Sequence, residues 1–252
     1  MANKTSPVPF SQLPAFFRGH LFLFDKPSRE TYQQSVGTRI LFICIALEGV
    51  IRPLLRAAAP WFDLGRIEWN GIALAAFMTI LAIGLTRGLA RVHFTQIGLC
   101  PWSRWSQSEK WYFPQALVLA LLVFTFVRKA NLVALVEVPA WFQTTVAVFG
   151  WQMNWGFYQE YVYRGLLQTE LTRRWGSVTG ILLSNLIFTF GPLHAYHFWI
   201  GIENPGHLWI FAAIFSIGLV FGILFHRSGN LWMVGVMHGF GDFFIDGLGT
   251  IR

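Results

Sequence analysis

The chain has 252 residues, of which 54% are hydrophobic and 12% are charged, and its formal net charge is +7. Because a soluble domain carries about 25% charged residues, this composition excludes an ordinary soluble protein and favours one that spans a membrane several times. The basic residues are scattered along the chain, so membrane topology and anionic lipid explain the positive charge better than nucleic acid does. The sequence carries no nucleic-acid-binding motif.

Residues 1–38 are predicted to form an N-terminal interfacial segment. The stretch from Phe10 to Phe24 is rich in Phe and Leu and resembles a signal peptide. However, Arg18, His20 and Asp25 interrupt or bound it, and no small-residue cleavage site follows. We therefore expect an amphipathic segment that lies at the membrane surface.

Residues 39–252 are predicted to form a single transmembrane helical domain, an all-α bundle with about seven spans. A helix needs about 20 mostly apolar residues to cross a bilayer. Stretches without charged residues that approach or exceed this length are Asn70 to Thr86, Trp111 to Val127, Val138 to Gln159, Trp175 to Ile202 and Asn204 to Phe225.

Two further spans carry charged side chains. The first runs from Ile40 to about Ala58, and the i, i+4 spacing of Glu48, Arg52 and Arg56 places them on one helix face. There Glu48 can partly neutralise the arginines. The last span runs from Leu231 to about Leu248.

The expected orientation follows from the basic residues, which concentrate in loops that stay cytoplasmic. A cytoplasmic N-terminus places most of the Lys and Arg residues outside the spans on the cytoplasmic side. We therefore predict a multi-pass membrane protein whose N-terminus is cytoplasmic and whose nearest partner is the lipid bilayer.

The first polar motif is Gln159-Glu160-Tyr161-Val162-Tyr163-Arg164-Gly165, directly after an apolar run. Glu160 and Arg164 are four residues apart and can pair on one helix face. The functional interpretation is a carboxylate that Arg164 holds toward a wet cavity, where it accepts a proton from water. The alternative is a structural ion pair that pins two helices. Gly156 and Gly165 permit close approach of a helix or a substrate.

The second motif is Phe190-Gly191-Pro192-Leu193-His194. Pro192 lacks a backbone donor and is expected to kink or end the helix. Inside a membrane such irregular backbone is tolerated only where protein buries it or where it lines a water-filled cavity. His194 is therefore predicted to be a general base or a metal ligand near a reacting water. The alternative, an interfacial histidine, is favoured for His197.

The third motif runs from Gly235 to Asp242 and contains His238. Asp242 follows His238 by one turn, so its carboxylate can accept a hydrogen bond from one imidazole nitrogen and fix which nitrogen is free. Gly235 and Gly239 form a face of small residues that permits tight packing of helices. The alternative is a packing helix whose polar side chains satisfy one another.

Taken in order, Q-E-x-x-x-R, F-x-x-x-H and H-x-x-x-D resemble the motifs of the CAAX-protease and bacteriocin-processing (CPBP, Abi) intramembrane endopeptidases. The resemblance covers about residues 150–246. It implies a peptide hydrolase in which a Glu and a His activate water, while the histidine of the third motif and its partner support the oxyanion. The residues on the motif positions are four catalytic candidates, Glu160, His194, His238 and Asp242, and two supporting ones, Gln159 and Arg164.

The resemblance also implies a substrate and a location. The substrate would be a membrane-associated protein or peptide, cleaved near a terminus, and analogy places the chain in the bacterial cytoplasmic (inner) membrane. No cofactor is expected. A zinc-dependent membrane hydrolase, with the same residues around the metal, is an alternative.

One departure from the family pattern concerns the base. The first motif usually begins with two glutamates, and the first of them is usually the catalytic base, but Gln159 stands there. An amide cannot accept a proton usefully near neutral pH. Either Glu160 takes over, or Gln159 orients water while His194 is the base, or the chain is a catalytically impaired scaffold or immunity protein.

Overall fold

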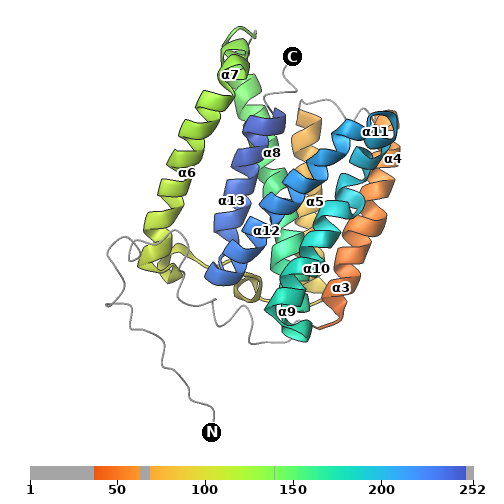
Figure 1. The fold of residues 1–252 in the computed structure, drawn as a ribbon. Coiled ribbons are helices and arrows are strands. Elements are labelled where there is room, and N and C mark those ends of the chain that lie inside the picture. Colours follow the sequence, from red (N-terminus) through yellow and green to blue (C-terminus); the bar gives the residue numbers. More distant parts are fainter. Residues whose placement is uncertain (1–36, 63–68, 139, 248–252) are drawn as a thin grey trace.

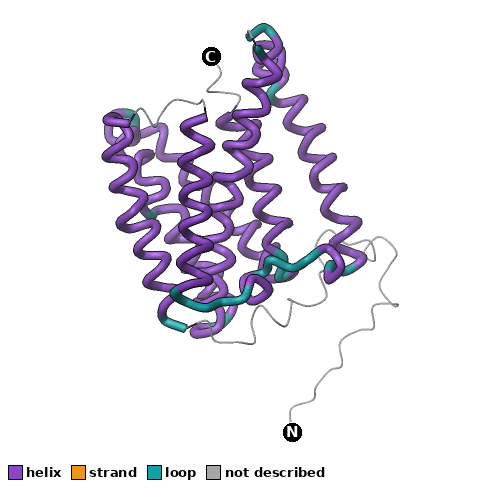
Figure 2. The backbone as a smooth tube through the Cα atoms, turned by 180° about the vertical axis from the view of Figure 1, so that it is seen from behind, coloured by secondary structure: helices purple, strands orange, loops and turns teal. Residues whose placement is uncertain are grey.

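The structure is a computed structural model that describes residues 37–62, 69–138 and 140–247 (Figure 1). The interfacial segment predicted for residues 1–38 lies almost wholly outside these ranges. Within them all regular secondary structure is helical, and no strand occurs there (Figure 2). The predicted all-α helical bundle is confirmed.

The α-helices, in chain order, are α3 (Arg39–Cys44), α4 (Arg52–Phe62), α5 (Trp69–Gly88), α6 (Gln107–Val127), α7 (Lys129–Val136), α8 (Trp141–Glu160), α9 (Thr169–Trp175), α10 (Ser177–Phe190), α11 (Ala195–Glu203), α12 (Ile210–Ser228) and α13 (Leu231–Asp242). Short π-helical segments continue α3, α8 and α13, and they are η2 (Ile45–Ile51), η5 (Tyr161–Gln168) and η8 (Phe243–Gly247). Short 3-10 turns are η3 (Phe94–Ile97), η4 (Trp102–Arg104), η6 (Pro192–His194) and η7 (Pro205–Trp209).

Four helical segments among the described residues are long and apolar enough to cross a membrane. They are Gly71–Gly88, Gln107–Val127, Ser177–Glu203 and Pro205–Ser228. Leu231–Ile245 is a shorter apolar helix. The three other predicted spans also coincide with helices of the bundle, and their crossing of the membrane stays a prediction. The chain is an integral membrane protein.

The predicted break at Pro192 is confirmed. α10 ends at Phe190, the turn η6 begins at Pro192, and α11 follows. The amide of Gly191 still donates to the carbonyl of Ile187 (2.9 Å), whereas Pro192 has no amide hydrogen to continue the series. The span expected from Trp175 to Ile202 is therefore two helices, and it begins after Trp175, because α9 ends there and Gly176 turns the chain with φ at +84°.

Glycines bring α8 and α13 together, as the spacing of Gly235 and Gly239 predicts. A Cβ atom on Gly156 would overlap the backbone of Gly239, and one on Gly235 would lie 2.5 Å from the ring of Phe157. Backbones can approach this closely only where neither helix carries a side chain. The crossing positions the end of α8, with Glu160, against the middle of α13. A Cβ atom on Gly165 would lie 3.2 Å from the carbonyl oxygen of Ile97, so this glycine permits the close approach of η3.

Two short helices, α7 and α9, lie outside the predicted spans. Residues 129–136, expected as part of a loop, form α7, and together with α6 they lie at one edge of the bundle, opposite α3 and α4 (Figure 1). α6 itself begins with a capping box: the Glu109 amide donates to Ser106 Oγ (3.2 Å) and the Ser106 amide donates to Glu109 Oε2 (2.7 Å).

Candidate active site

Glu160 lies at the last position of α8, and none of its surface is exposed. Its Oε1 accepts a hydrogen bond from Nδ1 of His238 (2.7 Å), and its Oε2 lies 3.2 Å from Nε of Arg164. The first and third motifs therefore meet directly. The predicted pair of Glu160 and Arg164 is confirmed, but the carboxylate is enclosed and does not face a wet cavity.

Arg164, which is also fully buried, joins the first motif to two neighbouring helices. Its Nη2 donates to the backbone carbonyl of Gly218 in α12 (2.9 Å), and its guanidinium lies 4.8 Å from the centre of the Phe188 ring in α10. Gly218 makes room for this contact, because a Cβ atom there would lie 3.1 Å from Nη2. The contacts of Arg164 thus agree with the alternative interpretation of this pair, a structural ion pair that pins helices.

His238 is held by a carboxylate on each side of its ring. Nδ1 donates to Glu160, and Nε2 lies 3.4 Å from Oδ1 of Asp242. The predicted pairing of His238 and Asp242 is confirmed. A doubly protonated imidazole donates from both nitrogens, so in that form the ring can pair with both carboxylates at once.

His194 occupies the turn between α10 and α11, and its side chain is partly buried. Its Nδ1 lies 2.8 Å from the backbone carbonyl of Phe188. A carbonyl oxygen can only accept, so Nδ1 carries the hydrogen and Nε2 of the neutral ring keeps its lone pair. The break between α10 and α11 at Pro192 therefore places His194 so that its tautomer is fixed and its Nε2 can accept a hydrogen bond.

The ring of Phe188 contacts both histidines. Its centre is 5.0 Å from that of His194 and 6.0 Å from that of His238, edge-on in both cases. One aromatic ring of α10 thus links the histidine of the second motif to that of the third.

Gln159 is buried, with 5% of its surface exposed, next to Glu160 in α8. No hydrogen bond joins its amide to Glu160, His194 or His238. Successive helix residues point about 100° apart, so Glu160 does not occupy the direction of Gln159.

A model of a known protein family matches the part of the chain that carries the three motifs. Residues 139–244 match the family described as Rce1-like, type II CAAX prenyl endopeptidase. The match spans 106 of the 252 residues and includes all three motifs. The match confirms the resemblance drawn from the three motifs, and the family implies CAAX-type endopeptidase activity within a membrane. No curated protein and no solved structure matches the chain.

The donor set of this Rce1-like site does not fit a metal centre. Among the described residues, no three His, Cys, Asp or Glu side chains converge as metal ligands do. A catalytic zinc typically takes three protein ligands and a water. In the cluster, Oε1 of Glu160 and Nδ1 of His238 instead form a hydrogen bond with each other. We therefore derive no step through a metal.

A second buried carboxylate touches the Rce1-like segment from outside it. Glu48 accepts hydrogen bonds from the hydroxyls of Tyr158 (2.7 Å) and Tyr163 (2.9 Å), which flank Glu160 in sequence. The sequence predicted its pairing with Arg52, and that pairing is confirmed (2.7 Å). The contacts with the tyrosines were missed, and the only signal for them is a carboxylate placed within an apolar span.

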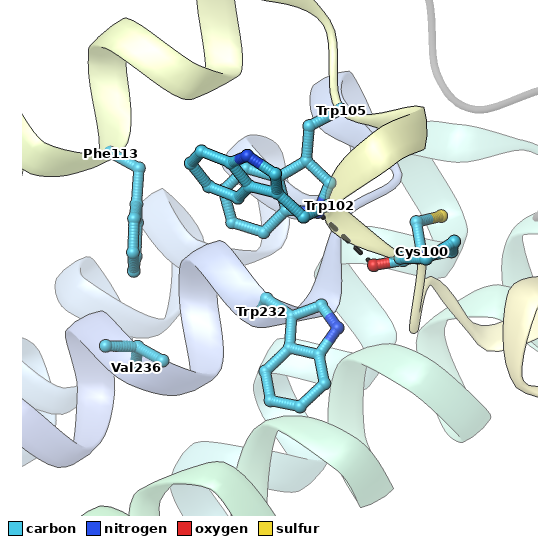
Figure 3. A pocket seen from close by; sticks show the side chains of 7 residues that line it. Cys100, Trp102, Trp105, Phe113, Trp232 and Val236 are labelled. Carbon is cyan, nitrogen blue, oxygen red and sulfur yellow. Dashed lines mark hydrogen bonds between the residues drawn. The ribbon is translucent and has the colours of Figure 1, made fainter.

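An apolar pocket of about 340 Å³ lies beside α13, which contributes Trp232 and Val236 to its lining (Figure 3). Its lining residues are Cys100, Pro101, Trp102, Trp105, Phe113, Trp232 and Val236. Trp105 Nε1 donates to the carbonyl of Cys100 (3.2 Å), which fixes one wall. None of the predicted site residues lines this pocket.

Proposed function

We propose that the chain is an intramembrane endopeptidase that hydrolyses a peptide bond near a terminus of a membrane-associated protein or peptide. The observation that carries the proposal is His194. Its Nδ1 is bound to the Phe188 carbonyl, and its Nε2 is left to accept a proton. Its ring packs against Phe188, which also contacts His238 of the His238–Glu160 pair, within an Rce1-like segment.

His194 is a better base than Glu160. Both oxygens of Glu160 face cationic or donor groups on Arg164 and His238, and its side chain is fully enclosed. A carboxylate held in this way is a poor acceptor for a proton from water. Glu160 would then position His238, and the amide of Gln159 would orient the water by hydrogen bonding.

In the proposed reaction, Nε2 of His194 takes a proton from water while the water oxygen attacks the scissile carbonyl carbon. The carbonyl oxygen becomes an oxyanion, which Nε2–H of His238 can stabilise, since its 3.4 Å contact with Asp242 is the longer of its two ion contacts. The tetrahedral intermediate then collapses, the C–N bond breaks, and the protonated His194 gives its proton to the leaving amine.

The alternative is a catalytically impaired scaffold or immunity protein. Two observations favour it: an amide stands at position 159, and the carboxylate of Glu160 is fully buried. In that case the ion pairs would hold the bundle together and His194 would be idle.

For the location, we propose a bacterial cytoplasmic membrane with the N-terminus in the cytoplasm. The distribution of basic residues supports this orientation. Cysteine accessibility, measured from each side of intact cells at single engineered sites next to Arg87 and Lys129, would test it.

The function is tested by cleavage of a panel of membrane peptides, with and without C-terminal prenylation, by purified protein in vesicles. The variants are Glu160→Ala, His194→Ala and Gln159→Glu, each with and without chelator. We expect cleavage by the wild type, loss in His194→Ala, and insensitivity to chelator. Cleavage only by Gln159→Glu would support the impaired scaffold, and loss with chelator would show a metal-dependent hydrolase.

A further inference from the structure

The helical segment formed by η2 and α4, which lies outside the Rce1-like segment, presents charged side chains on one face. Arg52 forms a two-point ion pair with Glu48, Nε to Oε2 at 2.7 Å and Nη2 to Oε1 at 3.0 Å. The two residues are 6% and 5% exposed. Arg56, one turn further along, is exposed and lies 5.1 Å from the centre of the Tyr196 ring.

This ion pair binds the helix that carries the first motif. Tyr158 and Tyr163 each donate a hydroxyl to a different oxygen of Glu48, and the guanidinium of Arg52 lies 4.3 Å from the centre of the Trp155 ring. Glu48 therefore receives four hydrogen bonds, so its oxygens are fully used and it is not itself a base. Its contacts reach the helix on both sides of Glu160.

The same contacts continue to the second motif. The ring of Tyr163 packs edge-on against Phe188, with centres 5.2 Å apart. Phe188 in turn supplies the carbonyl that fixes Nδ1 of His194. At the other end, Arg56 contacts Tyr196, two residues after His194. The turn η6, which contains His194, also packs directly against η2 and α4.

We propose that Glu48, with Arg52, is a positioning group for His194, acting through Tyr163 and Phe188. A buried ion pair is weak evidence for stability, and an ionisable residue within a membrane segment indicates function. The role for the reaction rests on the proposed function, but the placement of His194 can be measured without it. With this role, Glu48 and Arg52 would be part of the site although they lie outside residues 139–244, which match the family.

The experiment measures the modification of His194 by diethyl pyrocarbonate in the full-length protein in vesicles, read by mass spectrometry against the exposed His93. Glu48→Gln removes the charge but keeps the shape. Glu109→Gln is the matched control, because Glu109 is also buried and accepts from Asn230 (3.0 Å) and the Ser106 amide (2.7 Å), with no contact to the site. Tyr163→Phe removes the single hydroxyl that donates to Glu48, and it tests the same connection if Glu48→Gln does not fold.

We expect the ratio of His194 to His93 modification to change by about threefold or more in Glu48→Gln, by about twofold in Tyr163→Phe, and not at all in Glu109→Gln. If the wild type cleaves a peptide, kcat should fall by up to about 100-fold in Glu48→Gln with little change in KM, because misplacement of a base affects the transition state.

An unchanged ratio in folded Glu48→Gln and Tyr163→Phe would overturn the proposal, and so would an equal change in Glu109→Gln. If no peptide is cleaved even by the wild type, the proposed function fails while the modification ratio still decides whether Glu48 positions His194.

Discussion

Two carboxylate–arginine pairs in this bundle follow the same sequence pattern and serve different ends. Glu48–Arg52 and Glu160–Arg164 are both i, i+4 pairs, and both are buried. Glu48 is saturated by two tyrosine hydroxyls and its own arginine, whereas Glu160 gives one oxygen to His238. The spacing predicts the pairs, but the partners across the bundle decide that Glu160 contacts the catalytic candidate His238 directly, whereas Glu48 reaches the site only through tyrosine side chains.

The comparison is tested most severely by removing each carboxylate. Glu160→Ala leaves Arg164 buried without its partner, and we expect a loss of about 3–5 kcal/mol in the free energy of unfolding. Glu48→Ala should cost a similar amount, for the same reason, at Arg52. Denaturant unfolding in detergent micelles measures both.

Replacing each arginine together with its carboxylate separates the two roles. Glu48→Gln with Arg52→Met should recover part of the lost stability, because no charge is then left unpaired. Glu160→Gln with Arg164→Met should recover stability but leave His238 with only one of its two carboxylates, that of Asp242. If a double variant is no more stable than the variant that removes the carboxylate alone, the charges of that carboxylate and its arginine are not coupled.

The glycine crossing that joins Glu160 to His238 gives a smaller effect. Gly156→Ala forces α8 and α13 apart, because the new methyl group would overlap the backbone of Gly239. We expect a loss of about 1–3 kcal/mol in unfolding free energy and weaker contact between Glu160 and His238. Gly150→Ala is the matched control in the same helix, since nothing lies within 4 Å of a Cβ atom there. Similar losses in both variants would contradict the close crossing.

The smallest effect is expected at Arg56. Its contact with Tyr196 is exposed, so Arg56→Gln should change the unfolding free energy by about 0.5–1 kcal/mol. Arg56→Lys should retain part of that. A loss as large as that of Glu48→Ala would show that Arg56 has a role beyond the cation–π contact.

Much of the site could be predicted because its pairs are local in sequence. The pairs Glu160–Arg164 and His238–Asp242 follow from one-turn spacing, and the helix break follows from Pro192. Contacts between residues on different helices could not be predicted from spacing along the sequence. The contact of Glu160 with His238 joins residues 78 apart in sequence, and no spacing rule reports it.

Two further features depend on backbone geometry that the sequence does not signal. The π-helical segment η5 begins directly after Glu160 and contains Arg164. Such segments are rare and often occur at functional sites, but no residue type marks them. The tautomer of His194 likewise depends on where the Phe188 carbonyl points after α10 ends.

The central claim is that His194, and not Glu160, accepts the proton. It is tested most directly by comparing peptide cleavage in His194→Gln with that in His197→Gln, a neighbouring buried histidine whose Nδ1 lies 2.8 Å from Nε2 of His207. Loss of a general base costs about 100- to 10,000-fold in rate. We predict that loss for His194→Gln, with activity close to wild type in His197→Gln. Cleavage that survives His194→Gln would contradict the account.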